Sequence, residues 1–245
     1  MKALSVLLLI LGLGFGQLSQ AKTISLTTTD WAPFYGSKLD DGGFIAVIVR
    51  ESLKASGYDS NLEFISWGDA LEQVKSGQKD ILVGAYFSEE RNQDYHFSLP
   101  IYSVLTGIIK KEGLPLDFYN SFEMLDEYKI GKIDQSVVSK SFDAYPFKNL
   151  TGFIGVDDGL KALDAGTIDL YVDSFAVAKN VATDIGIDPA SLKLLQPPIE
   201  ENQLYVLVSK NIPGAIELRD AFNKGFVQIQ VNGTYDKILS RFNQN

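Results

Sequence analysis

Arg91 is the residue in this sequence best placed to bind an anion. It ends the segment Ser-Glu-Glu-Arg at 88–91, which follows a short apolar stretch with the composition of a buried strand. In α/β sheets, ligands bind beyond the carboxyl ends of the strands. The planar guanidinium can hold a carboxylate through two parallel hydrogen bonds. The alternative is a surface ion pair with a neighbouring acid: Glu89, Glu90 or Asp94.

The other polar patterns support catalysis or metal binding less well. His96 is the single histidine and no Gly-x-Ser-x-Gly sequence is present, so a nucleophilic hydrolase has little support. One histidine cannot build the usual zinc site, and no calcium-loop pattern occurs. We therefore expect no metal and no cofactor. The paired acids fit loops, helix caps or a solvated surface: Asp40–Asp41, Glu89–Glu90, Asp157–Asp158 and Glu200–Glu201.

Composition narrows the classes of partner. The 245 residues include 22 Lys and Arg against 31 Asp and Glu, which gives a formal net charge of -9. A nucleic-acid-binding protein would show a basic face, so no nucleic-acid partner is expected. The absence of Cys excludes disulfides, thiolate nucleophiles, cysteine-ligated metals and lipid attachment through an N-terminal cysteine.

The first residues have the pattern of a secretory signal peptide. Lys2 precedes an apolar run at 4–15, and Ser19 and Ala21 supply small residues at the positions that a signal peptidase reads. We predict a signal peptide at 1–21, cleaved after Ala21. The alternative is an uncleaved membrane anchor, but the run is shorter than the ~20 residues of a membrane span. The mature chain is expected to lie free in the periplasm, without a lipid anchor.

Strands and helices alternate along the first half of the mature chain. Such alternation predicts an α/β fold with a parallel sheet. The spacing of Leu71, Gly77 and Asp80 recurs 89 residues later, which indicates two α/β units of similar plan. The predicted elements are strands at 23–28, 62–65 and 80–84, a helix from Phe44 that ends at Gly57, and a helix around 70–74 that ends at Gly77.

Two long apolar runs, at 102–110 and 204–209, bracket the middle of the chain. They predict an inserted domain that two strands connect to the rest. The first lobe would comprise 22–107 plus 204–245, and the second lobe 108–203. Amphipathic helices predicted at 216–226 and 235–242 would pack back on the first lobe.

Several motifs together resemble a known family. The segment Thr-Thr-Asp-Trp-Ala-Pro-Phe at 28–34, the turn at 88–91 and Phe-Ser-x-Pro-x-Tyr at 97–102 are similar to those of the family 3 extracellular solute-binding proteins. These are periplasmic receptors for polar amino acids that supply ABC importers. The resemblance extends over essentially the whole mature chain. It implies a periplasmic-binding-protein fold of type II, in which two α/β lobes joined by two hinge strands close on the ligand.

The resemblance also implies a site for a small zwitterion. Arg91 matches the residue that binds the α-carboxylate of the ligand, and Asp173 matches the acid that binds its α-ammonium group. Ser136 matches a hydroxyl at a helix start that adds donors to the carboxylate. Trp31 matches the aromatic platform over the ligand side chain. Trp67 would be a second wall of the pocket or, alternatively, a core residue.

The sequence departs from the family pattern at the expected pocket. Gly84 and Tyr86 stand where close relatives have small hydroxyl residues that touch the ligand amine, so Tyr86 is expected to reshape the pocket. Gln135 replaces a usual glycine. Thr28 stands where receptors for basic amino acids have an acid. These departures leave the identity of the ligand open.

The resemblance predicts a binding protein without enzymatic activity, and we expect a monomer because hinge closure needs free lobes. It would capture a small polar ligand, an amino acid, and deliver it to an ABC importer. One alternative is a ligand-sensing partner of a membrane signalling protein, which shares the fold and differs in its docking partner. The other is a cleft enzyme resembling the cyclohexadienyl dehydratases, in which burial would raise the pKa of Asp173 or Glu201.

Overall fold

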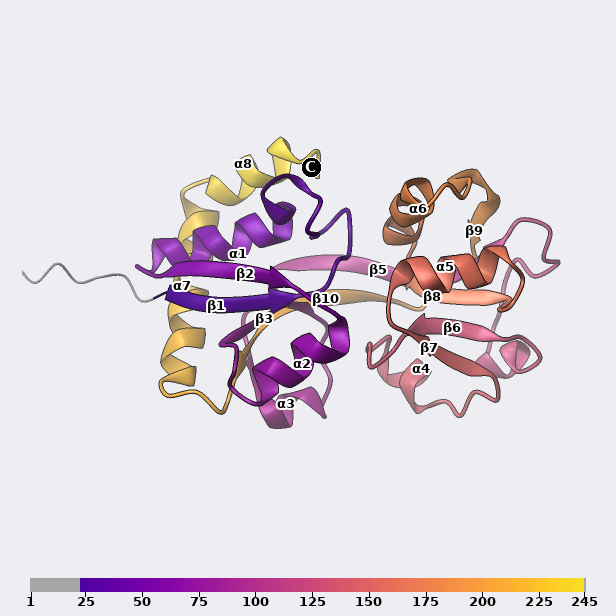
Figure 1. Ribbon diagram of the computed structural model, residues 1–245, viewed down its shortest axis with the longest axis horizontal. Helices are drawn as coiled ribbons and strands as arrows, with labels where there is room; N and C mark the ends of the chain where they lie inside the picture. Colours follow the sequence, from indigo (N-terminus) through magenta and orange to yellow (C-terminus); the bar gives the residue numbers. More distant parts are fainter. Residues whose placement is uncertain (1–22, 245) are drawn as a thin grey trace, which may run out of the picture.

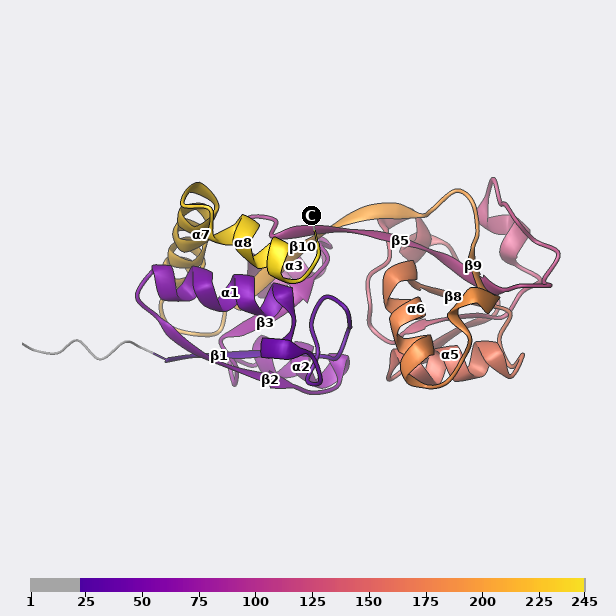
Figure 2. The same cartoon turned by 90° about the horizontal axis from the view of Figure 1, so that it is seen from above.

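The computed structural model describes residues 23–244, so the predicted signal peptide at 1–21 lies outside the described residues. Two α/β lobes lie side by side, joined by the long strands β5 (Tyr102–Lys111) and β10 (Glu200–Ser209) (Figure 1). The view from above shows the same two connections (Figure 2). Within residues 23–244, no helix is long and apolar enough to cross a membrane.

The first lobe contains both ends of the described chain. Its further elements are β1 (Thr23–Thr28), a 3-10 helix (Asp40–Gly42), α1 (Phe44–Ala55), β2 (Asp59–Phe64), α2 (Trp67–Lys75), β3 (Ile81–Ala85), α3 (Arg91–Asp94), β4 (Tyr95–Phe97), α7 (Ala215–Val231) and α8 (Thr234–Arg241). The sheet order is β2-β1-β3-β10. β1 is parallel to β2 and β3, whereas β10 is antiparallel to β3. In Figure 1, α1 and α8 lie above these strands and α2 lies below them.

The second lobe repeats this plan with shorter elements. These are a 3-10 helix (Phe122–Leu125), β6 (Ile130–Ile133), α4 (Lys140–Ala144), β7 (Leu150–Phe153), α5 (Val156–Asp164), β8 (Leu170–Ser174), α6 (Phe175–Asp184), a 3-10 helix (Pro189–Ser191) and β9 (Leu192–Leu194). The sheet continues from β10 through β5, β8 and β6 to β7, and β9 pairs with β5. β6 is parallel to β7 and β8.

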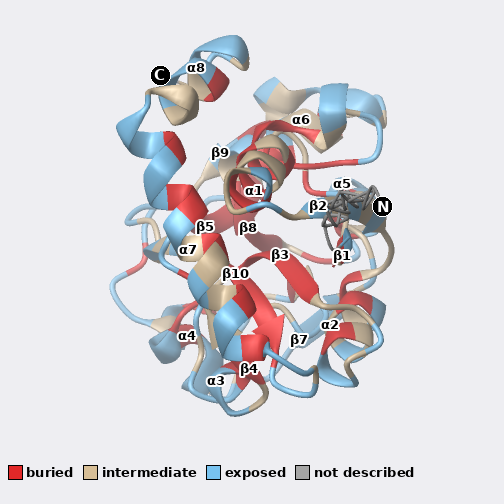
Figure 3. Ribbon diagram, turned by 90° about the vertical axis from the view of Figure 1, so that its left-hand side faces the viewer, coloured by how far each residue is buried: buried red, intermediate tan, exposed pale blue. Residues whose placement is uncertain are grey.

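The centres of the two lobes are the short strands β3 and β8. All five residues of each strand are buried, as a strand covered on both faces of a sheet requires. Figure 3 shows the burial of β3 between exposed outer helix faces. Because both strands are fixed on both sides, the residues at their carboxyl ends are held in defined positions. Arg91 follows β3, and Asp173 lies near the end of β8.

The repeated spacing in the sequence corresponds to a repeated structure. α2 leads through Gly77 to β3, and α5 leads through Gly166 to β8. Both glycines have left-handed backbone conformations, with φ of 77° and 71°, which a glycine adopts without steric cost. The two α/β units of similar plan are therefore confirmed as structural equivalents.

The proposed division between the lobes falls inside the connecting strands. β10 pairs with β3 in the first lobe and with β5 across the connection. β5 in turn pairs with β8 in the second lobe. The boundaries at 107/108 and 203/204 stay a prediction.

The predicted helix at 216–226 extends to Val231, because the chain continues to supply buried residues such as Ile229.

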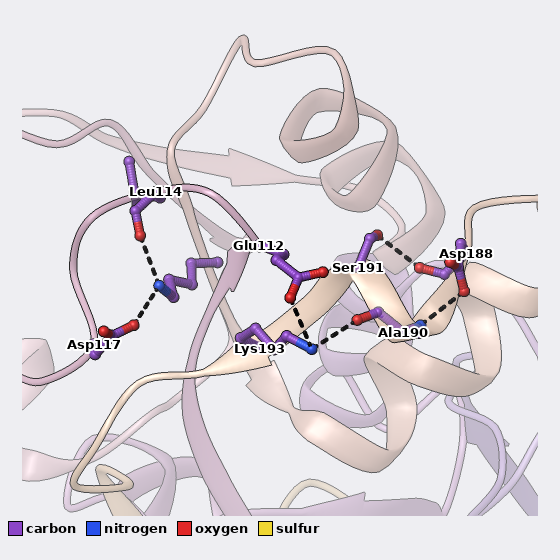
Figure 4. Close-up of polar contacts among 8 residues, drawn as sticks. Glu112, Leu114, Asp117, Asp188, Ala190, Ser191 and Lys193 are labelled. Atoms are coloured by element: carbon purple, nitrogen blue, oxygen red, sulfur yellow. Dashed lines mark hydrogen bonds and ion pairs between the residues drawn. The ribbon is translucent and has the colours of Figure 1, made fainter.

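A polar network fixes the far end of β5 in the second lobe. The buried Lys110 donates hydrogen bonds from Nζ to the Leu114 carbonyl (2.6 Å) and to Asp117 Oδ1 (2.7 Å). Next to it, Lys193 pairs with Glu112 at 3.6 Å and donates to the Ala190 carbonyl (Figure 4). These contacts hold the loop after β5 against the segment that leads into β9.

Helices α1 and α7 approach each other most closely at Gly225. A Cβ atom at this position would lie 1.9 Å from the Ser52 carbonyl oxygen of α1. The Ser56 hydroxyl of α1 also donates to the Ala221 carbonyl of α7 at 2.5 Å. Only glycine therefore permits this helix contact.

We predict that Gly225→Ala lowers the stability of the protein. The added methyl group must separate two packed helices, which costs about 1–3 kcal/mol and exceeds the helix propensity gained. The expected fall in melting temperature is about 2–4 °C per kcal/mol. Val231→Ala, at an 83% exposed position of the same helix, is the control and should leave the melting temperature unchanged. An unchanged melting temperature for Gly225→Ala would contradict the packing argument.

Candidate functional site

A cavity lies between the two lobes and brings together all six of the residues singled out in the sequence. Its empty volume is about 670 Å³, part of which is open to solvent. The first lobe contributes residues that follow β1, β2 and β3, and the second lobe contributes residues at the ends of β6 and β8. The six are Trp31, Trp67, Tyr86, Arg91, Ser136 and Asp173.

Arg91 is the cation of this cavity. It is the first residue of α3, and only 7% of its surface is exposed. Nη1 donates to the Tyr86 carbonyl and Nη2 donates to the Gln135 carbonyl, each at 3.0 Å. The guanidinium also lies over the ring of Trp67, 5.3 Å from its centroid. Burial lowers the pKa of Arg91 to about 10, so the group is charged at neutral pH.

Within residues 23–244, no acidic side chain forms an ion pair with Arg91. The alternative prediction, a surface ion pair between Arg91 and Glu89, Glu90 or Asp94, is therefore wrong. Asp94 instead pairs with Lys75 at 2.8 Å. The guanidinium has five N–H donors, and its two hydrogen bonds to protein carbonyls leave others for a ligand.

Asp173 is the anion of the cavity and is also 7% exposed. Its Oδ1 accepts hydrogen bonds from Trp31 Nε1 at 2.9 Å and from the Ser174 backbone N–H at 2.6 Å. Among the described residues, no Lys or Arg pairs with it. Burial raises the pKa of Asp173 to about 7, although the two hydrogen bonds act in the opposite direction.

The two charges stand on opposite lobes and face one cavity. A buried charge without a partner is costly, because burial removes its hydration without a compensating ion pair. A ligand with a carboxylate near Arg91 and an ammonium group near Asp173 would compensate both costs at once. Such a ligand would also link the two lobes.

Aromatic rings form much of the wall on the first lobe. Trp31 packs against Tyr35 with ring centroids 5.5 Å apart, and its contact with Tyr86 is edge-on at 6.1 Å. The Tyr86 hydroxyl lies 3.2 Å from Thr106 Oγ1 on the connecting strand β5. Trp67 is 7% exposed and combines both predicted roles, because it belongs to a hydrophobic cluster and also lines the cavity.

Tyr35 lines the cavity and was not anticipated from the sequence. A Cβ atom at Gly84 would lie 2.4 Å from Tyr35 Cε1, and Gly84 has a φ of +80°. The Tyr35 hydroxyl donates to the Gly84 carbonyl at 3.0 Å. The tyrosine ring thus occupies the volume that a side chain at position 84 would need. An isolated glycine at the end of a buried strand was the signal available in the sequence.

The expected helix start at Ser136 is wrong. The chain turns after β6, and α4 begins at Lys140 with Ser139 as its N-cap. Ser136 lines the cavity from this turn, and its hydroxyl donates to the Ile133 carbonyl at 2.6 Å. The same turn brings the backbone carbonyl of Gln135 into contact with Arg91.

Gln135 belongs to the second lobe, and its backbone carbonyl contacts two residues of the first lobe. Its φ of +56° is a left-handed conformation, which explains why glycine suits the position. Its carbonyl accepts hydrogen bonds from Arg91 Nη2 at 3.0 Å and from Trp67 Nε1 at 3.4 Å. Gln135 thus makes its contacts through a backbone conformation that glycine would adopt without steric cost.

Other polar candidates lie outside the cavity or are used structurally. Glu201 is exposed and pairs with Leu105 on the connecting strands. His96 lies in β4 opposite Val208. The Thr28 hydroxyl donates to the Val83 carbonyl at 2.8 Å. In residues 23–244, no group of three or more His, Cys, Asp or Glu could hold a metal ion.

Solved structures of the same fold include a sensor and amino-acid receptors. A histidine kinase sensor domain with similarity to periplasmic binding proteins has a TM-score of 0.80 at 20% identity, covering 91% of this chain and 96% of that one. The arginine-, lysine-, histidine-binding protein ArtJ from Geobacillus stearothermophilus has 0.75 at 22%, covering 90% and 95%. An ancestral arginine-binding protein has 0.74 at 25%, covering 90% and 97%.

These likenesses confirm the two-lobed periplasmic-binding-protein fold. No curated protein matches the sequence significantly. The sequence itself matches the bacterial extracellular solute-binding proteins, family 3, over residues 24–245. This match includes every residue that lines the cavity. The chain therefore belongs to the bacterial extracellular solute-binding proteins, family 3.

Proposed function

We propose that this protein binds a free α-amino acid as a zwitterion in the cavity between its lobes. Arg91 binds the α-carboxylate and Asp173 binds the α-ammonium group. The observation that carries this proposal is the pair of buried, opposite charges that lack ionic partners among the described residues. A zwitterion is the smallest common metabolite type that satisfies both.

The remaining contacts position these two groups. The Tyr86 and Gln135 carbonyls orient the guanidinium from two sides, and Trp67 supports its face. Trp31 fixes Asp173 Oδ1, while Oδ2 makes no hydrogen bond to a described residue and is available to an ammonium group. Because Arg91 and Asp173 belong to different lobes, a ligand that binds both stabilises the closed arrangement.

Delivery to an ABC importer from the periplasm is the physiological role that we propose, with the protein acting as a monomer after export. Substrate-binding proteins of amino acid ABC transporters that have the same fold support it. A membrane signalling protein as docking partner is the alternative, supported by the histidine kinase sensor domain. Deleting the gene should abolish high-affinity uptake of the radiolabelled ligand. Unchanged uptake together with a lost transcriptional response would favour the sensor role.

A cleft enzyme is the second candidate function, since burial raises the pKa of Asp173 to about 7. A carboxyl group with such a pKa can act as an acid or a base near neutral pH. Glu201 is exposed and outside the cavity, so Asp173 would carry this activity. Incubation with prephenate-like acids followed by product analysis tests it, and turnover that Asp173→Asn abolishes would establish the enzyme.

We predict that Arg91→Gln and Asp173→Asn each weaken amino-acid binding by at least about a hundredfold, because each leaves a buried ligand charge unpaired. Isothermal titration calorimetry on the purified protein measures the loss. The decarboxylated amine should bind Arg91→Gln as well as it binds the wild type. Arg219→Gln, which removes a half-buried arginine that pairs with Asp220 outside the cavity, is the control. Wild-type affinity in Arg91→Gln would remove Arg91 from the site.

We predict that affinity for the amino acid rises with pH through neutrality. Below pH about 7 Asp173 holds a proton that an incoming ammonium group must displace. Between pH about 8.5 and 5.5 the dissociation constant should therefore increase about thirtyfold through this group. Burial raises the pKa values of the neighbouring Tyr35 and Tyr86, which stay neutral throughout. Titration of Asp173→Asn should lack this dependence, and a flat wild-type profile would contradict the assignment.

The ligand-free protein should show the opposite trend in stability. Folded Asp173 keeps its proton up to pH about 7, whereas the ordinary pKa is 3.8. Between these values the folded state binds more protons than the unfolded state, so the contribution of this group falls as pH rises. Asp173→Asn should therefore gain stability relative to the wild type as the pH rises from about 4 to about 7. Urea unfolding at several pH values measures the difference, and parallel curves for the two proteins would contradict the raised pKa.

A further inference from the structure

We propose that the amino acid bound in this cavity has an apolar side chain. This inference rests on the proposed function, since it assigns the carboxylate and ammonium group of the ligand to Arg91 and Asp173. It concerns what surrounds the rest of the ligand. The candidates are amino acids with branched or straight aliphatic side chains and those with an unsubstituted aromatic ring.

The second lobe presents an aliphatic wall to the cavity. It comes from three parts of the lobe: the end of β6 with the turn that follows it, the start of α5, and β8. The members are Ile133, Val137, Val138, Ile154, Val156 and Val172. The opposite wall carries the rings of Trp31, Tyr35 and Tyr86. A ligand side chain that leaves the charged groups therefore meets apolar surface on both lobes.

Ile154 is the exposed member of this wall. It precedes Gly155, the N-cap of α5, and 75% of its surface is accessible. Val156, two residues later, is 6% exposed. An apolar ligand side chain would cover Ile154 and thereby remove apolar surface from water.

A basic side chain lacks a suitable partner in this cavity. Apart from Asp173, Asp30 is the one acidic residue among the described residues that line it. Asp30 is exposed, and its two oxygens accept from the Ser37 backbone N–H at 2.5 Å and from the Ser37 hydroxyl at 3.1 Å. An ion pair with such a hydrated carboxylate adds little affinity.

An acidic side chain also lacks a partner. Arg91 is the one cation among the described lining residues, and the α-carboxylate of the ligand requires it. Lys132 of β6 is a further cation next to the lining residue Ile133 in the chain, and its Nζ donates to the Ser136 carbonyl and lies 3.5 Å from Ser136 Oγ. Lys132 is thus held by the turn and does not line the cavity.

A homologous series of ligands tests the inference by calorimetry on the wild-type protein. Alanine, 2-aminobutyrate, norvaline and norleucine differ by single methylene groups, and each should increase affinity about fourfold until the cavity is filled. Lysine and norleucine form the matched pair, because their chains are similar in length and only lysine ends in an ammonium group. Norleucine should bind at least tenfold more tightly than lysine, and leucine more tightly than glutamate.

A variant of the wall should reduce the preference for an apolar side chain. Ile154→Asp places a carboxylate at the mouth of the cavity, so it should weaken norleucine binding about tenfold or more and narrow its advantage over lysine. Ile216→Asp is the control, because Ile216 is 51% exposed on α7 and outside the cavity. This control should retain the wild-type order of affinities, and circular dichroism verifies that both variants are folded.

The outcomes separate this inference from the proposed function. Tighter binding of lysine, arginine or glutamate than of norleucine would overturn the apolar assignment and leave the zwitterion site intact. If Asp30→Asn then removed the affinity for lysine, Asp30 would be the residue that binds the ammonium group of the lysine side chain. Failure of every amino acid to bind, alanine included, would overturn both proposals. Rising affinity along the series, reduced in Ile154→Asp, would establish the apolar pocket.

Discussion

Two opposite charges, each buried and without an ionic partner among the described residues, are the constraint around which this protein is organised. Arg91 and Asp173 are each 7% exposed, and each belongs to a different lobe. Isolated charges in such positions reduce stability, so the surrounding structure must hold them there. It does so with carbonyl groups, an indole N–H and the face of a tryptophan ring, none of which neutralises either charge.

The fold supplies the rigidity that this arrangement needs. β3 and β8 are the innermost strands of their lobes, and the charged groups follow or end them. The same two strands flank the connecting strands β10 and β5, so the charged groups lie close to the point about which the lobes can move. Because the two charged groups belong to different lobes, rotation of one lobe against the other at the connection would change their separation while each lobe stays intact.

Much of this could be predicted from the sequence, for reasons that differ from residue to residue. Arg91 was singled out by its place after an apolar strand, whereas Asp173, which lies within β8, was assigned only through the resemblance to the family. The repeat of Leu71, Gly77 and Asp80 anticipated the equivalent lobes, since a glycine stop before a buried strand has a direct structural meaning. Ser136 was misplaced at a helix start, because a second serine three residues later, Ser139, is the residue that caps α4.

The residues that were missed act through contacts between segments far apart in the sequence. Tyr35 fills space above Gly84, a relation across 49 positions that no local pattern encodes. Gln135 reaches Arg91 with a backbone carbonyl, so the identity of its side chain gave no signal. The aliphatic wall comes from β6, β8 and the start of α5, and its members look like ordinary core residues in the sequence.

Hydrogen bonds between the lobes have a kinetic consequence. Trp31 donates to Asp173, and both Arg91 and Trp67 donate to the Gln135 carbonyl, so these contacts join the lobes across the cavity. They must break whenever the lobes separate. The rate of separation is therefore an upper limit on the rate at which a molecule can enter a closed protein, however concentrated that molecule is. The residence time of a bound molecule depends on the same separation of the lobes. These hydrogen bonds therefore help to set the rate at which bound and free molecules exchange.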